Sequence, residues 1–375
     1  MAITSWFLCI LICAIWLAWG QPPGGGYAFP EACQASTLEI PLDGCPKNTV
    51  LVSATREKAH FRTIQGAIDS LPHDDTSQTF LILSGTYTEQ LNISRLGPLT
   101  LLGESNNPHN ASTNSVHVQW AAATAQGIYT DNVYTSVLIV APTLNANLTG
   151  SGPEGLPVPD GTPFGCSDFR TYNIDFWNVY AEQSAGHAHS LSLSLANGGF
   201  YYSWLYSYQD TVFIGKLGNA YFHSSMVAGE TDFLYGFGTA WFEQCDLVLQ
   251  GCGGWITPWK GTNTAYANKF GVYVHASAIN AANASVAVEH EGRCALGRPW
   301  NSGHQSIFAG TYENGMIQDS EYVLWQAPIT EQTLMGDVIL DERTWDEYNS
   351  PAKVFLTEDG RPDIVEWIDQ RIRWR

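Results

Sequence analysis

The segment Gly199-Phe200-Tyr201-Tyr202 recurs in altered form as Ala220-Tyr221-Phe222-His223 and as Ala240-Trp241-Phe242-Glu243, at nearly equal intervals along the chain. Each copy is followed by alternating apolar and polar residues and then by a turn, which is the pattern of short β-strands. A repeat of about 20 residues is typical of a solenoid, in which each turn of the chain packs only on its neighbours. The simplest architecture is therefore all-β, a parallel β-helix with one turn of the chain per repeat.

Other segments continue this style outside the repeat. Further short strands are expected at 80–83, 99–102, 137–140 and 191–195. Helical periodicity is confined to 64–71, which Thr63 precedes as a possible cap, and to the C-terminal tail. The alternative is a β-sandwich of antiparallel hairpins, for which Asn197-Gly198 supplies one tight turn. Most connections are longer, which favours the β-helix with a few short peripheral helices and long loops.

The composition agrees with a folded, strand-rich protein. The 375 residues are 45% hydrophobic and 14% charged, with 35 Gly, 14 Trp, 17 Tyr and 16 Phe. Aromatic side chains fit a pleated surface, and glycine weakens helix interiors. The 17 Lys and Arg against 36 Asp and Glu give a net charge of −19. A nucleic-acid partner is not expected, because phosphate recognition needs a cationic surface.

Residues 1–20 are expected to be a signal peptide. They carry no charge, and small residues precede a cleavage site after Gly20, although the usual basic residue at the start is missing. A membrane anchor is the alternative, but the apolar run is shorter than the about 20 residues that span a bilayer. We expect a secreted, extracellular protein with no membrane association, in which 21–48 form an N-terminal extension and 49–375 one β-helix domain.

The cysteines and glycosylation sequences fit secretion. Removing the signal peptide leaves six cysteines, Cys33, Cys45, Cys166, Cys245, Cys252 and Cys294. An even number in an oxidising compartment indicates disulfides, and the spacing does not fix their pairing. No CxxC or HxxxH cluster accompanies them, so a metal site is not expected. Four Asn-x-Ser/Thr sequences begin at Asn92, Asn110, Asn147 and Asn283.

The repeat also brings two carboxylates together. Asp210 follows Gly199, and Asp232 follows Ala220, at almost the same separation along the chain. Equivalent positions of successive turns stack at about 4.8 Å, so these side chains should be neighbours on one face. Two close carboxylates cannot both ionise easily, which separates their pKa values and suits acid/base chemistry. The alternative is that both are solvated turn residues.

The sequence around these aspartates resembles a known family. Residues 208–212, Tyr-Gln-Asp-Thr-Val, resemble the Tyr-Gln-Asp-Thr-Leu of the pectin methylesterase (pectinesterase) family, and 229–236 resemble its Gly-x-Val-Asp-Phe-Ile-Phe-Gly. Residues 296–300 match its Leu-Gly-Arg-Pro-Trp, and weaker matches begin upstream at Phe61. The resemblance runs from Thr49 to Trp325 and implies a right-handed parallel β-helix. The segment 21–48 is too short for the inhibitory pro-region of plant members.

The resemblance also implies the roles of four residues. Asp232 would be the nucleophile that attacks the methyl ester carbonyl of an esterified galacturonate. Asp210 would first protonate the departing methanol and then activate water as a base. Arg298 would keep Asp232 ionised, and Gln209 would donate its amide hydrogens to the tetrahedral oxyanion.

Four further side chains are expected to bind substrate. By resemblance, Trp300 would pack on a sugar ring, with Phe233 and Tyr235 as a supporting wall. His189 aligns with a second oxyanion glutamine of the family. A neutral imidazole has one N–H and can replace that donor, or His189 is structural and the oxyanion hole is weaker. His187 is nearby and is a second candidate for the same place.

The expected function is hydrolysis of pectin methyl esters to pectate and methanol by a monomer whose partner is the pectin polysaccharide. Two alternatives remain: a catalytically weak relative that binds polygalacturonate, and an ester or thioester hydrolase with another substrate. The sequence holds no Gly-x-Ser-x-Gly, His-Glu-x-x-His or phosphate-binding glycine loop, so no cofactor is expected. The net negative charge predicts repulsion of the product, whose carboxylates are freed by the reaction.

Overall fold

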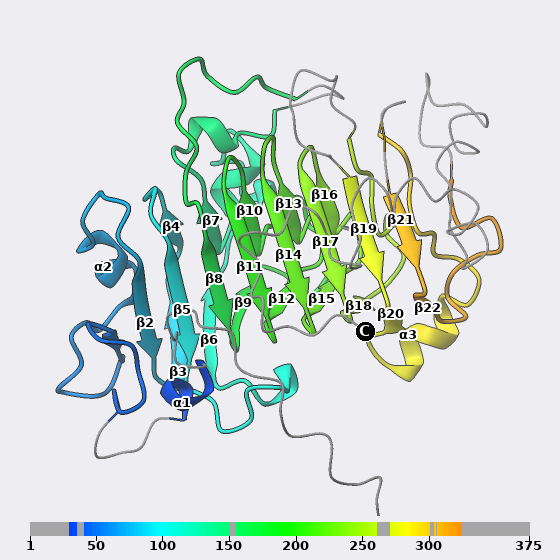
Figure 1. The fold of residues 1–375 in the computed structure, drawn as a ribbon. Helices are drawn as coiled ribbons and strands as arrows, with labels where there is room; N and C mark the ends of the chain where they lie inside the picture. The colour runs from blue at the N-terminus through cyan, green and yellow to red at the C-terminus, as the bar shows by residue number, and fades with distance from the viewer. Residues whose placement is uncertain are drawn as a thin grey trace, which may run out of the picture.

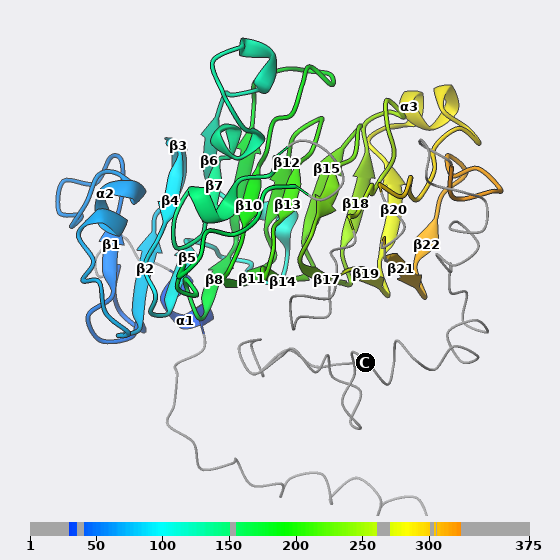
Figure 2. The same cartoon turned by 90° about the horizontal axis from the view of Figure 1, so that it is seen from above.

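The computed structural model describes residues 30–35, 41–150, 155–260, 271–300, 304 and 306–323. The expected signal peptide, the first part of the extension, the Pro/Gly stretch 21–26 and the C-terminal tail lie outside these residues. Within them the chain forms a parallel β-helix of three sheets, here called A, B and C (Figures 1 and 2). Every strand pairing that the structure describes is parallel, which confirms the β-helix and excludes the antiparallel sandwich.

Over residues 78–236 the strands follow the order A, B, C in each turn of the chain, and over 239–313 the described strands alternate between sheets A and B. Sheet A contains β1 (Val50–Val52), β2 (Gln78–Ile82), β5 (Leu99–Gly103), β8 (Phe169–Tyr172), β11 (Asn197–Tyr201), β14 (Asn219–His223), β17 (Thr239–Glu243), β19 (Gly271–His275) and β21 (Ser306–Ala309). Sheet B contains β3 (Gly85–Thr88), β6 (Val116–Trp120), β9 (Ile174–Asn178), β12 (Trp204–Tyr206), β15 (Met226–Gly229), β18 (Asp246–Leu249), β20 (Ala278–Ala281) and β22 (Tyr312–Glu313). Sheet C contains β4 (Leu91–Ile93), β7 (Leu138–Val140), β10 (Leu191–Leu193), β13 (Val212–Ile214) and β16 (Leu234–Gly236).

The aromatic repeat forms the central strands of sheet A. Phe200 of β11, Phe222 of β14 and Phe242 of β17 occupy equivalent positions of the parallel register. Their rings stack inside the coil, with centroids 4.7 Å and 4.3 Å apart, and all three are fully buried. A parallel register brings the same face of each strand inward, so a repeated aromatic residue becomes a continuous stack in the core. The segment that predicted the fold therefore also fills its interior.

From β8 onward, the turns between sheets A and B are short and alike, whereas the earlier connection between β5 and β6 is longer and covers 104–115. In the short turns, one or two positions separate each strand of sheet A from the next strand of sheet B, and in five successive turns the first of them is a non-glycine residue with a positive φ. These positions hold Asn173, Tyr202, Ser224, Gln244 and Ala276. The left-handed conformation reverses the chain at a single residue, so it fixes the corner of each turn at the cost of local strain. We call this row the A–B turns.

Helices are short and peripheral, as the sequence predicts. They are α1 (Pro30–Gln34), α2 (Ile64–Asp69), α3 (Ala284–Glu289) and the 3-10 helices η1 (Ala111–Thr113), η2 (Thr124–Gln126), η3 (Asn132–Thr135) and η4 (Asn145–Asn147). The predicted cap Thr63 accepts a hydrogen bond from the N–H of Gly66 at the start of α2. The sequence analysis missed α3, which has no buried residue and therefore shows no apolar periodicity.

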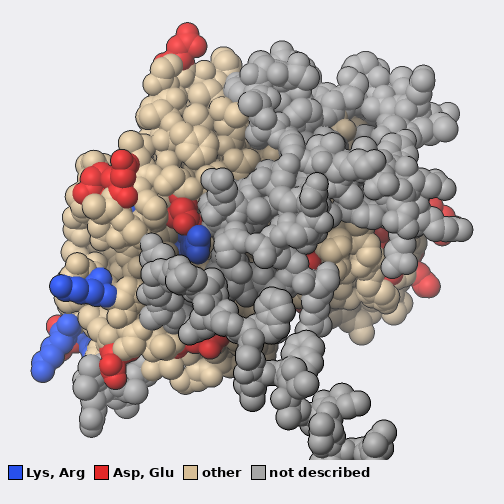
Figure 3. Space-filling model, viewed as in Figure 1, with Lys and Arg blue, Asp and Glu red and all other residues tan. Residues whose placement is uncertain are grey.

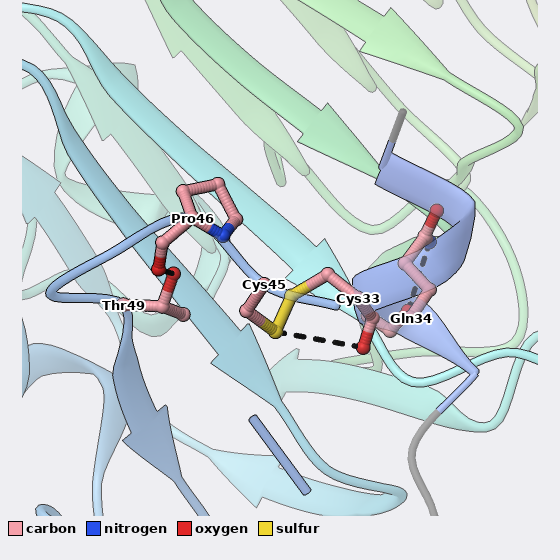
Figure 4. Close-up of a disulfide and its surroundings, with 6 residues drawn as sticks. Cys33, Gln34, Cys45, Pro46 and Thr49 are labelled. Carbon is pink, nitrogen blue, oxygen red and sulfur yellow. Dashed lines mark hydrogen bonds between the residues drawn. A yellow bond between two sulfur atoms is a disulfide. The ribbon is translucent and has the colours of Figure 1, made fainter. Parts of the chain in front are cut away.

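The described part of the N-terminal extension is attached to the β-helix. Helix α1 packs against β5, and a disulfide joins Cys33 to Cys45 (Figure 4). The amide of the buried Gln34 donates hydrogen bonds to the carbonyl oxygen of Gly103 and to Oδ1 of Asn173, both at 2.9 Å. The hydrogen bonds of Gln34 fix this segment to the β-helix, and the disulfide closes a loop within the extension.

A second disulfide joins Cys252 to Cys294. Cys166 and Cys245 are free thiols, and both are buried. Burial raises the pKa of Cys166 to about 11, so this thiol stays protonated and unreactive at neutral pH. The expectation of disulfides is confirmed for four of the six cysteines.

Two of the four glycosylation sequences begin at exposed residues, Asn110 and Asn283. Both side chains cap a short helix. Asn147 is fully buried, and its Oδ1 accepts a hydrogen bond from the hydroxyl of Ser194. The fold therefore leaves no room for a glycan on Asn147.

Charged side chains of the described residues are scattered over the face shown in Figure 3, without one dominant acidic or basic patch. Within the described ranges, no helix is both long enough and apolar enough to cross a membrane.

Candidate active site

Asp210 and Asp232 lie in successive turns between sheets B and C. A parallel bridge pairs Gln209 with Thr231, and the N–H of Asp210 donates to the carbonyl oxygen of Thr231 at 3.0 Å. The two aspartates therefore follow equivalent residues of adjacent coils, which confirms that they stack. Their exposed fractions are only 4% and 7%, so they are not solvated turn residues.

The register explains the slightly unequal spacing in the sequence. Gly198, and not Gly199, pairs with Ala220. Counted from Gly198 and from Ala220, the two aspartates stand at the same position of their repeats. Both have a positive φ, 59° at Asp210 and 50° at Asp232. A left-handed conformation is uncommon for residues other than glycine, and its presence at two stacked carboxylates indicates a geometry that the surrounding coil enforces.

Arg298 binds Asp232 through two hydrogen bonds. Its Nε donates to Oδ1 at 2.9 Å, and its Nη2 donates to Oδ2. Burial raises the pKa of Asp232, and the hydrogen bonds and charge of Arg298 oppose that rise. Arg298 alone would lower the pKa, so the direction found here means that desolvation outweighs the guanidinium. The carboxylate is held in one orientation by a planar partner that matches its two oxygens.

His187 forms the corresponding pair with Asp210. Nδ1 of His187 and Oδ2 of Asp210 are 2.6 Å apart. The negative charge of Asp210 raises the pKa of His187, although burial opposes the shift. The two stacked carboxylates therefore have different partners, a guanidinium at Asp232 and an imidazole at Asp210.

A cavity of about 510 Å³ opens over these groups. Its lining includes Asp131, His187, Asp210, Asp232, Tyr235 and Trp300. Thus Asp210, Asp232, Tyr235 and Trp300 lie together, as the sequence analysis expects. Asp131, Asp210, Asp232 and His187 all lie in loops between sheets B and C. These loops vary more in length than the A–B turns, so they can carry side chains over the cavity.

His189 does not line this cavity. Its ring is fully buried, with Nδ1 2.7 Å from the hydroxyl of Ser192 and Nε2 2.6 Å from the hydroxyl of Tyr235. Burial lowers the pKa of His189 well below its usual value, which keeps the ring neutral. The structure thus corrects the expectation that His189 binds substrate and gives this residue the structural position instead. Its ring supports Tyr235 from beneath the cavity.

Phe233 is also placed differently from the expectation. It is fully buried in the main core of the β-helix, so it is not a wall of the cavity. Alternation within β16 turns Leu234 into the core and Tyr235 toward the cavity, whereas Phe233 precedes the strand and enters the core as well. Trp300 is half-buried at the cavity, where Nζ of Lys260 lies 4.6 Å from a ring centroid of its indole.

Gln209 is not among the lining residues of this cavity. Its Oε1 accepts a hydrogen bond from the N–H of Gly186 at 3.1 Å, and its backbone oxygen accepts one from Ala188 at 3.1 Å. The oxygen of this amide is therefore occupied by the backbone that precedes His187. This contact orients the amide so that its nitrogen points away from Gly186.

The sequence analysis missed two charged residues of the cavity lining, Asp131 and Lys260. Asp131 accepts hydrogen bonds from the N–H and hydroxyl of Thr149 and from the N–H of Gly150, which ties together two loops of the cavity wall. Lys260 is buried and lines the same cavity. Asp131 precedes a 3-10 helix as a cap, a common local role that gives no sign of its long-range contacts.

Comparisons with known proteins agree with this geometry. A family model described as Pectinesterase matches residues 164–338. A probable pectinesterase A of Aspergillus niger is 29% identical over 259 residues, which are 69% of this chain and 67% of that protein. A probable pectinesterase A of Aspergillus oryzae is 27% identical over 316 residues, covering 76% of this chain and 85% of that protein. The described fold and the site thus occur in a chain that is similar to proteins named pectinesterase over 69% and 76% of its length.

Solved structures of pectin methylesterases share the fold of this chain. The enzyme from Aspergillus niger in deglycosylated form has a TM-score of 0.62 and 24% identity, covering 76% of this chain and 82% of that one. The enzyme from carrot has a TM-score of 0.59 and 17% identity, covering 74% and 77%. A pectin methylesterase in complex with a hexasaccharide has a TM-score of 0.59 and 21% identity, covering 85% and 100%.

Proposed function

We propose that this protein hydrolyses the methyl esters of pectin to pectate and methanol. The observation that carries the proposal is the pair of stacked, buried aspartates at one cavity, one of them bound by an arginine through two hydrogen bonds. An ester hydrolase of this kind needs a carboxylate nucleophile and a separate acid/base group within reach of the same carbonyl. The relatives named pectinesterase support the choice of ester.

In the proposed reaction Asp232 is the nucleophile. Its carboxylate attacks the ester carbonyl, and Arg298 keeps the attacking oxygen oriented and favours the ionised form. Asp210, in the preceding coil, belongs to the acid/base group that protonates departing methanol and later takes a proton from water. An acyl-enzyme on Asp232 forms in the first step and is hydrolysed in the second.

Gln209 is proposed as the oxyanion donor. Its amide oxygen is fixed by the N–H of Gly186, which leaves the two amide hydrogens for other acceptors. One well-placed donor to a developing oxyanion contributes about 3 kcal/mol. Removing this amide with Gln209→Leu should therefore lower kcat by about 10²-fold with a smaller effect on KM.

Trp300 and Tyr235 are proposed to bind the polysaccharide. Both line the cavity, and an indole face presents an apolar surface that suits the face of a pyranose ring. A related structure holds a hexasaccharide, which fits a protein whose partner is a chain of sugars. We propose further that the protein is secreted and acts extracellularly as a monomer.

The proposal is tested by methanol release from highly esterified pectin by the purified protein. We expect release by the wild type and a loss of at least about 10³-fold in the Asp232→Asn variant, since the amide is not a nucleophile. No methanol from the wild type between acidic and neutral pH would refute the activity. Sugar binding without methanol release would instead support a binding role, and release from a different ester would reassign the substrate.

A further inference from the structure

We propose that His187, through its Nε2 atom, is the group that exchanges protons with methanol and water, and that Asp210 orients the imidazole. This inference rests on the proposed ester hydrolysis and changes the assignment of one role in it. The observation behind it is the hydrogen bond of 2.6 Å between Nδ1 of His187 and Oδ2 of Asp210 at the wall of the cavity.

The two partners differ in their access to the cavity. The side chain of Asp210 is 5% exposed, whereas that of His187 is 42% exposed, and both line the cavity. Nδ1 of His187 is used by Asp210, and Nε2 has no hydrogen-bond partner among the described residues. The imidazole therefore offers one occupied nitrogen to the carboxylate and one open nitrogen to a bound substrate.

The backbone around His187 holds the ring in this place. The N–H of His187 donates to Oγ1 of Thr124, and the N–H of Thr124 donates to the carbonyl oxygen of His187, both at 3.0 Å. The residues on either side of His187 donate hydrogen bonds to Gln209. The N–H of Gly186 donates to its Oε1, and the N–H of Ala188 donates to its backbone oxygen. Together these hydrogen bonds fix the segment on which the imidazole is carried.

Several charged or titratable groups surround the imidazole. Asp210 and Asp232 favour its protonated form, and Lys260 disfavours it. The buried His189 also interacts with it electrostatically. The combined effect raises the pKa of His187, chiefly because of Asp210. A proton is therefore kept on the imidazole at weakly acidic pH.

This arrangement disfavours Asp210 as the direct proton donor. The carboxyl of Asp210 is 5% exposed and already bonded to Nδ1 of His187. The imidazole is 42% exposed, so its Nε2 has the better access to methanol and water in the cavity. In a general arrangement of catalytic histidines, a buried carboxylate binds one ring nitrogen and so orients the other nitrogen, which transfers the proton.

The proton balance closes over one turnover. Asp232 attacks the ester carbon, the bond from carbon to the methoxy oxygen breaks, and the imidazolium gives its Nε2 proton to that oxygen. Methanol leaves, and His187 is neutral. Water then attacks the acyl-enzyme while Nε2 takes one of its protons, the bond from the acyl carbon to Asp232 breaks, and the carboxylic acid leaves with Asp232 ionised and His187 protonated again.

The test compares the pH dependence of kcat in the wild type and in His187→Gln. If the imidazolium is the acid, kcat of the wild type falls at higher pH as His187 loses its proton. Glutamine keeps a polar side chain but does not titrate, so Asp210 must then serve as acid. We expect kcat to fall by about 10²-fold near neutral pH, with the falling limb shifted by at least about one pH unit toward acid and KM little changed.

A matched control is His117→Gln. His117 also pairs with a buried aspartate, Asp175, at 3.1 Å, but this pair is not among the lining residues of the cavity. The control should keep the wild-type profile. A His187→Gln variant that does the same, with kcat within about twofold of the wild type, would overturn the inference and leave the ester hydrolysis standing. A wild type that releases no methanol would overturn both.

A second measurement does not depend on the folding of a variant. NMR titration of labelled histidines in the wild type gives the pKa of the His187 ring directly, with the assignment made from a His187→Asn spectrum or from through-bond connectivities. We expect this pKa to lie above the usual value for histidine and to coincide, in the free enzyme, with the falling limb of kcat/KM. A pKa more than about one unit away from that limb would contradict the assignment.

Discussion

The turns between sheets A and B differ from the turns between sheets B and C in length and in content. The A–B turns have one or two positions, and their left-handed corners hold Asn173, Tyr202, Ser224, Gln244 and Ala276. The connection between β9 and β10 extends over 179–190, and the connection between β15 and β16 over 230–233. Both kinds of turn use a positive φ, but only the second kind places carboxylates and an imidazole at a cavity.

The difference separates two tasks of the coil. A turn that repeats with constant length keeps successive strands in register, so the identity of its side chain has little importance. A turn that varies in length can carry side chains above the coil, where the parallel register stacks them at the distance between strands. The left-handed residue is thus a structural corner at one edge, and at the other it carries a carboxylate that lines the cavity.

Of the substitutions that compare the two edges, Arg298→Gln is expected to have the largest effect, because Arg298 binds Asp232 in a turn between sheets B and C. Arg298→Gln removes the guanidinium that opposes the burial of Asp232, so the pKa of Asp232 should rise further. The nucleophile is then ionised only at higher pH. We expect kcat to fall by about 10²-fold or more and the acidic limb of the profile to move toward higher pH, as measured by methanol release.

The matched control is Arg170→Gln. Arg170 donates from Nε and Nη2 to the two carboxylate oxygens of Asp168, at 2.7 Å and 2.9 Å, in sheet A and away from the cavity. The same substitution there should leave the pH profile unchanged. An equal shift in both variants would mean that the effect is not specific to Asp232.

A substitution in sheet A should affect stability rather than chemistry. Phe222→Ala opens a cavity between the stacked rings of Phe200 and Phe242. We expect the free energy of unfolding to fall by about 3–5 kcal/mol, with kcat of the folded fraction unchanged. Chemical denaturation and methanol release measure the two quantities. Tyr312→Ala, at an exposed residue, should cost no more than about 0.5 kcal/mol.

A smaller effect is expected at an A–B turn. Ala276 is exposed and has a φ of 46°, which glycine adopts without the steric penalty of a Cβ. Ala276→Gly should therefore raise the free energy of unfolding by up to about 1 kcal/mol and leave kcat/KM unchanged. Ala281→Gly, in β20 with ordinary strand backbone, should instead destabilise by about 0.5–1 kcal/mol. Destabilisation by both substitutions would show that the left-handed corner is not strained.

The smallest effect concerns the net charge of −19. De-esterified polygalacturonate is a polyanion, so an acidic protein should repel it at long range, and salt should screen that repulsion. We expect the affinity for this product to increase modestly, by less than about tenfold, from low to high salt. The affinity is measured by calorimetry with the Asp232→Asn variant. An affinity that decreases with salt would indicate attraction by local cations such as Lys260 instead.

Much of the fold could be read from the sequence because a parallel β-helix is local and periodic. The aromatic repeat predicted both the coil and its stacked core, and the cap at Thr63 predicted the start of α2. Helix α3 was missed because it buries no side chain. The expected position of Phe233 was wrong because a motif shows which residues occur together, but only the folded chain shows that the turn before β16 directs Phe233 into the core.

The sequence by itself determined that Asp210 and Asp232 stack, since equal positions in a repeat must coincide in a parallel coil. The tertiary structure alone decided which of two neighbouring histidines reaches Asp210. His187 and His189 are separated by a single residue, yet one ring faces the cavity and the other is fully buried against Tyr235. Their segment is a loop before β10 without a fixed period of its own, so the direction of each ring is set by long-range hydrogen bonds to Thr124, Thr135 and Gln209.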